Sequence, residues 1–159
     1  MIQIQEIFKT LKFISDSSLL TEGQVKVLLP VLEDEIGIRK TRRIQRLLDR
    51  SGLKPIKNLE DFDWKFNPKL PREEIMRMVQ TPWAQEIRNF MLIGPGGVGK
   101  THLAKGTCYK AIQQGIPAVF ITCSDLIGKI KQSRNKNAVL DHYSTVDLLC
   151  IDEIGYVFP

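Results

Sequence analysis

The 159-residue sequence has few cysteines and no long apolar run, and both features narrow the class of protein to which it can belong. Cys108, Cys123 and Cys150 form no C-x-x-C pair, so reduced thiols of a cytosolic protein are the simplest interpretation. No stretch approaches the roughly 18 apolar residues that a membrane-spanning helix needs. The N-terminus has no basic segment followed by an apolar one, so no signal peptide is visible. These absences predict a cytoplasmic protein without a membrane segment.

The composition is that of an ordinary globular protein, with 43% hydrophobic and 26% charged residues. A chain of this length predicts one domain, or one domain with a small appendage. The formal net charge of +5 is modest, but the charge is not spread evenly, as the N-terminal half shows. The sequence contains no internal repeat and no low-complexity tract.

The segment from Gly94 to Thr101 fits G-x-x-x-x-G-K-S/T, the phosphate-binding loop of nucleoside triphosphatases. Its glycines let backbone N–H groups approach phosphate oxygens. Lys100 can place its charge on the β- and γ-phosphates, and the Thr101 hydroxyl can ligate Mg²⁺. A packing or solvent-exposed role is favoured for His102, although it directly follows the loop. The predicted nucleotide-binding residues are Gly94, Pro95, Gly96, Gly97, Val98, Gly99, Lys100, Thr101 and His102.

The surroundings of this loop are those that the motif requires. The apolar run Phe90–Ile93 predicts a buried parallel strand before the loop, and a helix is predicted from Lys100 to Gln114 after it. Further strands are predicted at residues 117–122 and at Val146–Ile151. A strand, a glycine loop and a helix in this order favour a phosphate site over a merely flexible loop.

Two carboxylates follow the last predicted strand and complete the chemistry of phosphoryl transfer to water. Asp152 is predicted to hold Mg²⁺ together with Thr101, through a metal-bound water. Glu153 is predicted to polarise the attacking water, with Lys100 as the second catalytic residue. The alternative is that the two acids only cap a helix or a turn. A small-molecule kinase would need an acceptor pocket, and the tandem acids favour water as the acceptor instead.

The N-terminal region predicts two helices, from Ile2 to about Phe13 and from about Glu22 to Arg50, separated by a break at Ser15–Ser18. Thr21 and Gln24 resemble a capping box at the start of the second helix, and Pro30 predicts a kink or a fresh start within it. A basic stripe lies along its second half. It is expected to be a solvated face, a contact surface for DNA phosphates, or a docking face for an acidic protein. The stripe consists of Arg39, Arg42, Arg43, Arg46 and Arg50.

Residues 53–71 are predicted to be a linker. Phe62 and Trp64 lie two residues apart, so they could flank an adenine ring or anchor the linker on the core. A helix is predicted from about Pro71 to Pro82. After the strand at 117–122, Ser124 or Asp125 is expected to cap a helix that contains Leu126, Ile127 and Ile130, and the basic region around Asn135–Asn137 is expected to be a loop.

Several of these segments resemble the IstB-like transposition helper ATPases, which are relatives of the DnaC-type replicative helicase loaders. The resemblance lies in the phosphate loop with His102-Leu103-Ala104, in Val119–Thr122 with Asp125-Leu126, and in the segment Leu149–Tyr156. It implies an α/β protein, with an N-terminal helical region at 1–55 and an AAA+ ATP-binding domain with a three-layer αβα parallel sheet at 56–159. It also implies ATP and Mg²⁺ as cofactors, DNA and a transposase or replicative helicase as partners, and a homo-oligomer.

The printed sequence stops soon after Asp152-Glu153, whereas the resemblance implies a sensor strand, an arginine finger and a helical lid beyond that point. The C-terminal half of the AAA+ domain is therefore expected to be missing. The implied strand order is 5-1-4-3-2, so strands two and three can pair while strand one faces two empty edges. Poor ATP hydrolysis, a marginal fold or a non-catalytic ATP- and DNA-binding module are the expectations that follow.

Overall fold

The computed structural model describes residues 2–11 and 20–156. The predicted break at Ser15–Ser18 lies outside the described residues. The chain forms two compact units, Met1–Gln45 and Arg46–Pro159, and each is described by itself. No helix of the described residues is both long enough and apolar enough to cross a membrane.

The first unit contains helix α1, Ile2–Leu11, and most of helix α2, Glu22–Arg50. Ile4, Ile7 and Leu11 of α1 are buried, as their helical spacing predicts. The side chain of Arg39 in α2 donates a hydrogen bond of 3.4 Å to the carbonyl oxygen of Leu11. This contact ties the middle of α2 to the end of α1.

The start of α2 confirms the predicted capping box. The Gln24 side-chain oxygen accepts from the Thr21 backbone N–H at 2.9 Å, and the Thr21 hydroxyl accepts from the Gln24 backbone N–H at 3.4 Å. The helix continues through Pro30 to Arg50 without interruption, so the predicted fresh start at this proline is wrong. Ring closure removes the donor of one backbone hydrogen bond at Pro30, but the flanking residues of a long helix keep the others.

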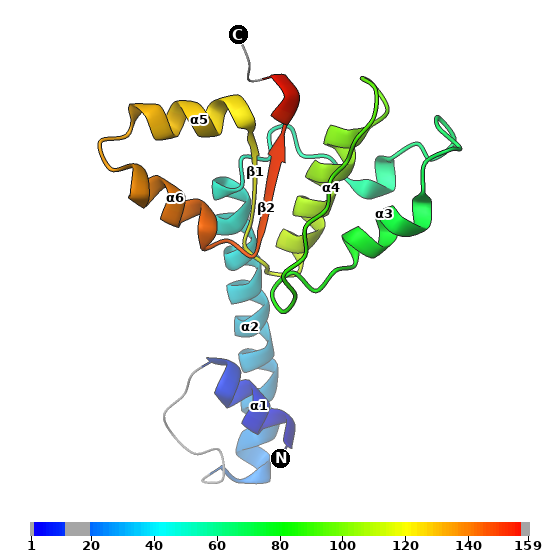
Figure 1. Ribbon diagram of the computed structural model, residues 1–159. Coiled ribbons are helices and arrows are strands. Elements are labelled where there is room, and N and C mark those ends of the chain that lie inside the picture. The colour runs from blue at the N-terminus through cyan, green and yellow to red at the C-terminus, as the bar shows by residue number, and fades with distance from the viewer. Residues whose placement is uncertain (1, 12–19, 157–159) are drawn as a thin grey trace. The chain divides into compact units, whose positions relative to one another are not determined.

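The second unit is built on a two-stranded parallel sheet. Strand β1, Ala118–Thr122, pairs with β2, Leu148–Asp152, in the register Ala118↔Leu148 to Thr122↔Asp152. Helix α4, Lys100–Gln113, contacts both strands, while α5, Cys123–Gln132, contacts β1 and packs against α6, Lys136–Ser144 (Figure 1). The remaining elements are η2, Leu59–Asp61, α3, Arg72–Val79, and η3, Ile154–Tyr156.

Alternate residues of β1 form the centre of one core cluster. Val119 and Ile121 are buried with Tyr143 of α6, and half-buried apolar side chains of α5, α6 and β2 surround them. The intervening residue, Phe120, has the ammonium of Lys105 in α4 at 4.8 Å from its ring centroid. Side chains on opposite faces of β1 therefore meet different helices, as the two-residue repeat of a strand requires.

The pairing of β1 with β2 confirms that the second and third predicted strands are neighbours. The strand predicted at Phe90–Ile93 is wrong, because residues 86–95 have no regular secondary structure and no ladder partner. Met91 is 76% exposed and Ile93 is 85% exposed. In the order 5-1-4-3-2 this segment would lie between strands four and five. The described residues contain neither, so its backbone groups have nothing to pair with.

The free edge of β1 is partly covered by the segment that follows α2. The backbone N–H of Phe120 donates a hydrogen bond of 2.7 Å to the carbonyl oxygen of Ser51. Gly52 adopts φ +72°, and a Cβ added there would lie 2.3 Å from the Phe120 carbonyl oxygen. Glycine is needed at this position for both its backbone conformation and its close approach to the strand.

Two further predictions in this unit are corrected. Thr122, rather than Ser124 or Asp125, caps α5: its hydroxyl accepts from the Asp125 backbone N–H at 3.1 Å and donates to the Asp125 carboxylate at 2.7 Å. The loop expected around Asn135–Asn137 lies slightly earlier in the chain. Only residues 133–135 separate α5 from α6, whose N-cap Asn135 accepts from the Ala138 N–H at 3.1 Å. Its charged side chains are compatible with helix because they remain exposed.

Candidate nucleotide-binding site

The glycine loop runs directly into the N-terminus of α4. Gly99 is the N-cap residue, in the left-handed conformation with φ +94°, and Gly97 also has a positive φ of +79°. The carbonyl oxygen of Gly99 accepts from the Leu103 N–H at 2.9 Å, which starts the helix. The first-turn N–H groups of α4 have no earlier carbonyls in the helix to bind, and the helix dipole places partial positive charge there. This end of α4 is suited to a phosphate group.

The ammonium group of Lys100 lies against the backbone of the loop. Its ammonium group donates hydrogen bonds to the carbonyl oxygens of Gly94, at 2.8 Å, and Pro95, at 2.6 Å. Phosphate oxygens are stronger acceptors than these carbonyls because they are charged. The side chain can therefore exchange these bonds for contacts with a phosphate while remaining beside the loop.

The predicted metal-binding residues meet although they are 51 positions apart. The Thr101 hydroxyl, in the first turn of α4, donates a hydrogen bond of 2.7 Å to the Asp152 carboxylate at the end of β2. A hydroxyl and a carboxylate side by side supply the oxygen ligands that Mg²⁺ prefers, with phosphate and water completing its shell. Among residues 2–11 and 20–156 no group of three His, Cys, Asp or Glu side chains forms a denser metal site.

Glu153 follows in an unusual backbone conformation. Its φ is +58°, the only positive φ of a non-glycine residue in the described chain. Its backbone N–H donates to the second carboxylate oxygen of Asp152 at 3.0 Å, and its side chain is exposed. Such a conformation costs roughly 1–2 kcal/mol, and strained residues are concentrated at functional sites. The Asp152 carboxylate is thus held by two hydrogen bonds, whereas the Glu153 side chain is exposed.

The segment that contains Asn58 and Phe62 packs against the phosphate loop. The ring of Phe62 is 8% exposed and lies 5.3 Å from the His102 ring, and a Cβ added to Gly99 would come within 2.6 Å of it. A ring nitrogen of His102 lies 2.8 Å from the Asn58 carbonyl oxygen. Of the two roles left open for Phe62, these contacts favour anchoring of the linker. The same contacts indicate a packing role for His102, although Phe62 and His102 both lie against the phosphate loop.

Trp64 is less buried than Phe62. Its ring lies 4.8 Å from the Phe62 ring, and the Arg72 guanidinium lies 5.0 Å from the Trp64 centroid.

The contact between Asn58 and His102 could not be predicted from the sequence, because it joins a backbone carbonyl to a side chain 44 positions away.

A buried thiol lies behind the strand that carries Asp152. The hydrogen bond with the Cys150 thiol, and then burial, raise the pKa of Cys108 well above its usual value. Cys108 in α4 is fully buried, and Cys150 in β2 lies near the Ala104 carbonyl at 3.9 Å. All three cysteines are free thiols, as predicted. The packing joins α4 and β2, the two elements that present Thr101 and Asp152.

The five arginines of the basic stripe are exposed on α2. Arg39 forms an ion pair of 2.6 Å with Glu35, one helical turn earlier. Arg39, Arg42 and Arg43 belong to the first unit, whereas Arg46 and Arg50 belong to the second. Each of these side chains is exposed within its own unit.

A glycine loop at a helix N-terminus, with its threonine bonded to an aspartate at the end of a parallel strand, is typical of phosphate-loop nucleotide-binding proteins. Comparison with protein families supports this class. The model of the family described as "IstB-like ATP binding protein" matches residues 5–158. The chain belongs to this family.

Curated relatives come from bacterial mobile elements and from replication. The "Insertion sequence IS232 putative ATP-binding protein" of Bacillus thuringiensis is 31% identical over 136 residues, covering 84% of this chain and 54% of the relative. The "Insertion sequence IS21 putative ATP-binding protein" of Pseudomonas aeruginosa is 32% identical over 129 residues, covering 79% and 49%. The replicative helicase loader DnaC of Escherichia coli K12 is 29% identical over 124 residues, covering 73% and 51%. The chain thus spans about half the length of the curated relatives it matches.

Proposed function

We propose that the chain binds Mg-ATP through Gly94–Thr101. The observation that carries this proposal is the 2.7 Å hydrogen bond between the Thr101 hydroxyl and the Asp152 carboxylate. It brings together the two segments that the phosphate-loop chemistry requires, although they are far apart in the sequence. Membership of an ATP-binding family supports the same nucleotide.

We propose ATP hydrolysis as the reaction of the site. Lys100 balances the charge of the β- and γ-phosphates, while Thr101 and Asp152 would hold Mg²⁺. When bound, the ion supplies positive charge to the phosphate oxygens. Glu153 positions and polarises the attacking water, and its exposed carboxylate is free to accept the proton. The neighbouring Asp152 is already committed to Thr101 and to the Glu153 backbone, so it is the poorer base.

The proposed setting is DNA transposition. In this role the protein would act as an ATP-dependent helper that oligomerises, contacts DNA through the Arg39–Arg50 stripe and acts with a transposase. Relatives named as ATP-binding proteins of insertion sequences support this setting. The exposure of all five arginines is compatible with phosphate contacts.

A helicase loader is the second candidate, because the DnaC relative matches 73% of this chain. Both candidates would bind ATP at the same site, so ATP binding alone does not distinguish them. Binding to a purified insertion-sequence transposase would support the first candidate. Binding to the replicative helicase, and not to that transposase, would support the second.

The enzymatic part of the proposal is tested by Glu153→Gln, with Glu60→Gln as a control that removes an exposed carboxylate from η2. Mg-ATP affinity and phosphate release are measured for both variants in the presence of DNA. We expect Glu153→Gln to bind ATP normally and to lose at least about 100-fold in turnover, within the range that a general base contributes. If the unaltered chain binds ATP without turning it over, the protein is a non-catalytic binding module.

A further inference from the structure

A cavity of about 670 Å³ lies beside β1 in the unit Arg46–Pro159. Its lining comes from the end of α2 and the segment after it, and from α4, β1, α5 and α6. Four cationic side chains line it, and Asp125 is its one acidic residue. The cations are Arg50, Lys54, Lys105 and Lys129. We call this cavity the basic groove.

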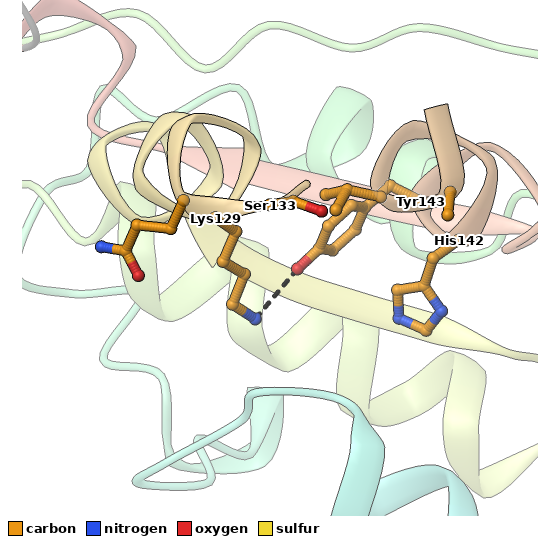
Figure 2. A pocket seen from close by; sticks show the side chains of 7 residues that line it. Lys129, Ser133, His142 and Tyr143 are labelled. Carbon is orange, nitrogen blue, oxygen red and sulfur yellow. Dashed lines mark hydrogen bonds between the residues drawn. The ribbon is translucent and has the colours of Figure 1, made fainter. Parts of the chain in front are cut away.

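The charges of the basic groove are not neutralised within the unit. None of its four cations forms an ion pair with a carboxylate of the residues that the structure describes. The Lys105 ammonium donates instead to the Lys54 carbonyl oxygen at 3.1 Å, and the Lys129 ammonium donates to the Tyr143 hydroxyl at 3.0 Å (Figure 2). The Asp125 carboxylate accepts from the Thr122 hydroxyl. Cations that converge in one groove create a field that attracts an anion.

The aromatic residues of the groove indicate which part of a ligand is recognised. Phe120 and Tyr143 are 8% and 7% exposed, and each has a lysine ammonium over its ring. Neither ring offers a free face on which a nucleotide base could stack. The groove is therefore suited to the charged backbone of a ligand rather than to its bases.

The basic groove continues into further positive surface. Arg50 is the last member of the stripe on α2, so one side chain belongs to both features. A cavity of about 490 Å³ between α5 and α6 shares Lys129, His142 and Tyr143 with the groove (Figure 2). The exposed Arg134 lies in the turn between these helices. The four groove cations come from α2, the segment after it, α4 and α5, and this spread matches a ligand with repeated negative charge better than one short acidic peptide.

We propose that the basic groove binds the phosphates of a nucleic-acid backbone and extends the contact made by Arg46 and Arg50. This inference rests on the proposed role in DNA handling and assigns Lys54, Lys105 and Lys129 to it. The groove is separate from the ATP site, because none of the phosphate-loop residues, and neither Asp152 nor Glu153, lines it.

The test compares the double variant Lys54→Gln/Lys129→Gln with the control Lys69→Gln/Lys110→Gln. The control loses the same charge from exposed positions outside the groove. Affinity of the full 159-residue chain for duplex and for single-stranded DNA of one length is measured against salt concentration. We expect the log–log slope to flatten only in the groove variant, by about 0.9 per lost duplex contact or about 0.7 per lost single-strand contact. Each slope change is divided by its own coefficient, and the form of DNA that loses more contacts is the form that the groove holds.

Lysine acylation followed by mass spectrometry tests the unaltered chain and does not depend on how a variant folds. Bound DNA should protect Lys54 and Lys129 from acylation and leave Lys69 and Lys110 reactive. Equal slopes for groove and control variants together with unprotected groove lysines would overturn the proposal. So would loss of binding to polyglutamate with unchanged DNA binding, which would assign the groove to an acidic protein.

Failure of this inference is distinguishable from failure of the proposed function. An unaltered chain that binds no DNA contradicts both. A chain whose salt slope falls with Arg42→Gln/Arg43→Gln, but not with the groove variant, contradicts the groove alone. Mg-ATP titration of the groove variant completes the comparison, and its affinity should equal that of the control.

Discussion

Gly99 is the position at which the phosphate loop is most tightly constrained, so Gly99→Ala is the first test of its construction. The residue has φ +94° and caps α4. An added Cβ would lie 2.6 Å from one ring carbon of Phe62 and 3.0 Å from another. Gly96 belongs to the same loop, but a Cβ added there would meet nothing within 4 Å. Gly96→Ala is therefore the matched control.

The cost of Gly99→Ala has two parts. A left-handed conformation costs a residue with a side chain roughly 1–2 kcal/mol. Displacement of the buried Phe62 ring, which is enclosed by His102 and Trp64, costs about 1–2 kcal/mol more, within the range for overpacking. We expect the free energy of unfolding to fall by about 2–4 kcal/mol in Gly99→Ala and by less than about 1 kcal/mol in Gly96→Ala.

Urea unfolding without nucleotide measures both variants, and a Phe62→Leu background separates the two parts. Leucine shortens the side chain that the new Cβ would meet, so in this background Gly99→Ala should cost only the roughly 1–2 kcal/mol of backbone strain. Equal losses for Gly99→Ala and Gly96→Ala would refute this account of the loop. An unchanged cost in the Phe62→Leu background would refute the contact with Phe62.

Two further predictions concern the core around the site. Gly52→Ala should lower the free energy of unfolding by at least about 2 kcal/mol, because its Cβ would lie 2.3 Å from a β1 carbonyl oxygen. Gly128→Ala in α5 is the control and should be neutral or stabilising, because a Cβ there meets open space. A similar effect of both variants in urea unfolding would contradict the contact between Gly52 and the edge of β1. Iodoacetamide should alkylate Cys123 well before Cys108, because Cys108 is fully buried and its pKa is raised by the hydrogen bond with the Cys150 thiol and by burial. Equal rates by mass spectrometry in the folded chain would contradict that packing.

Local sequence signals predicted several elements of the structure well. The capping pair Thr21 and Gln24, the loop before α4 and the strand that ends at Asp152 each depend on neighbouring residues, and the structure contains all of them. The resemblance also predicted the pairing of β1 with β2. These features follow from short patterns whose physical causes lie within a few residues.

Several features that depend on distant partners were not predicted. Phe90–Ile93 has the composition of a buried strand, but a strand forms only where another backbone can pair with it. The closure of β1 by Ser51 joins residues 69 positions apart and leaves no periodic pattern. Helix α6 was missed because its few apolar residues lie among polar and charged ones, and its stability comes from packing Tyr143 into the core.

The most direct test of the central claim is calorimetric titration of Mg-ATP into Lys100→Ala, with Lys110→Ala as the control. Lys100 is the one loop side chain that brings a full positive charge to the phosphates, whereas Lys110 is exposed near the end of the same helix. The account predicts that Lys100→Ala abolishes measurable Mg-ATP binding and that Lys110→Ala binds like the unaltered chain. Unchanged Mg-ATP affinity in a folded Lys100→Ala chain would contradict nucleotide binding through this loop.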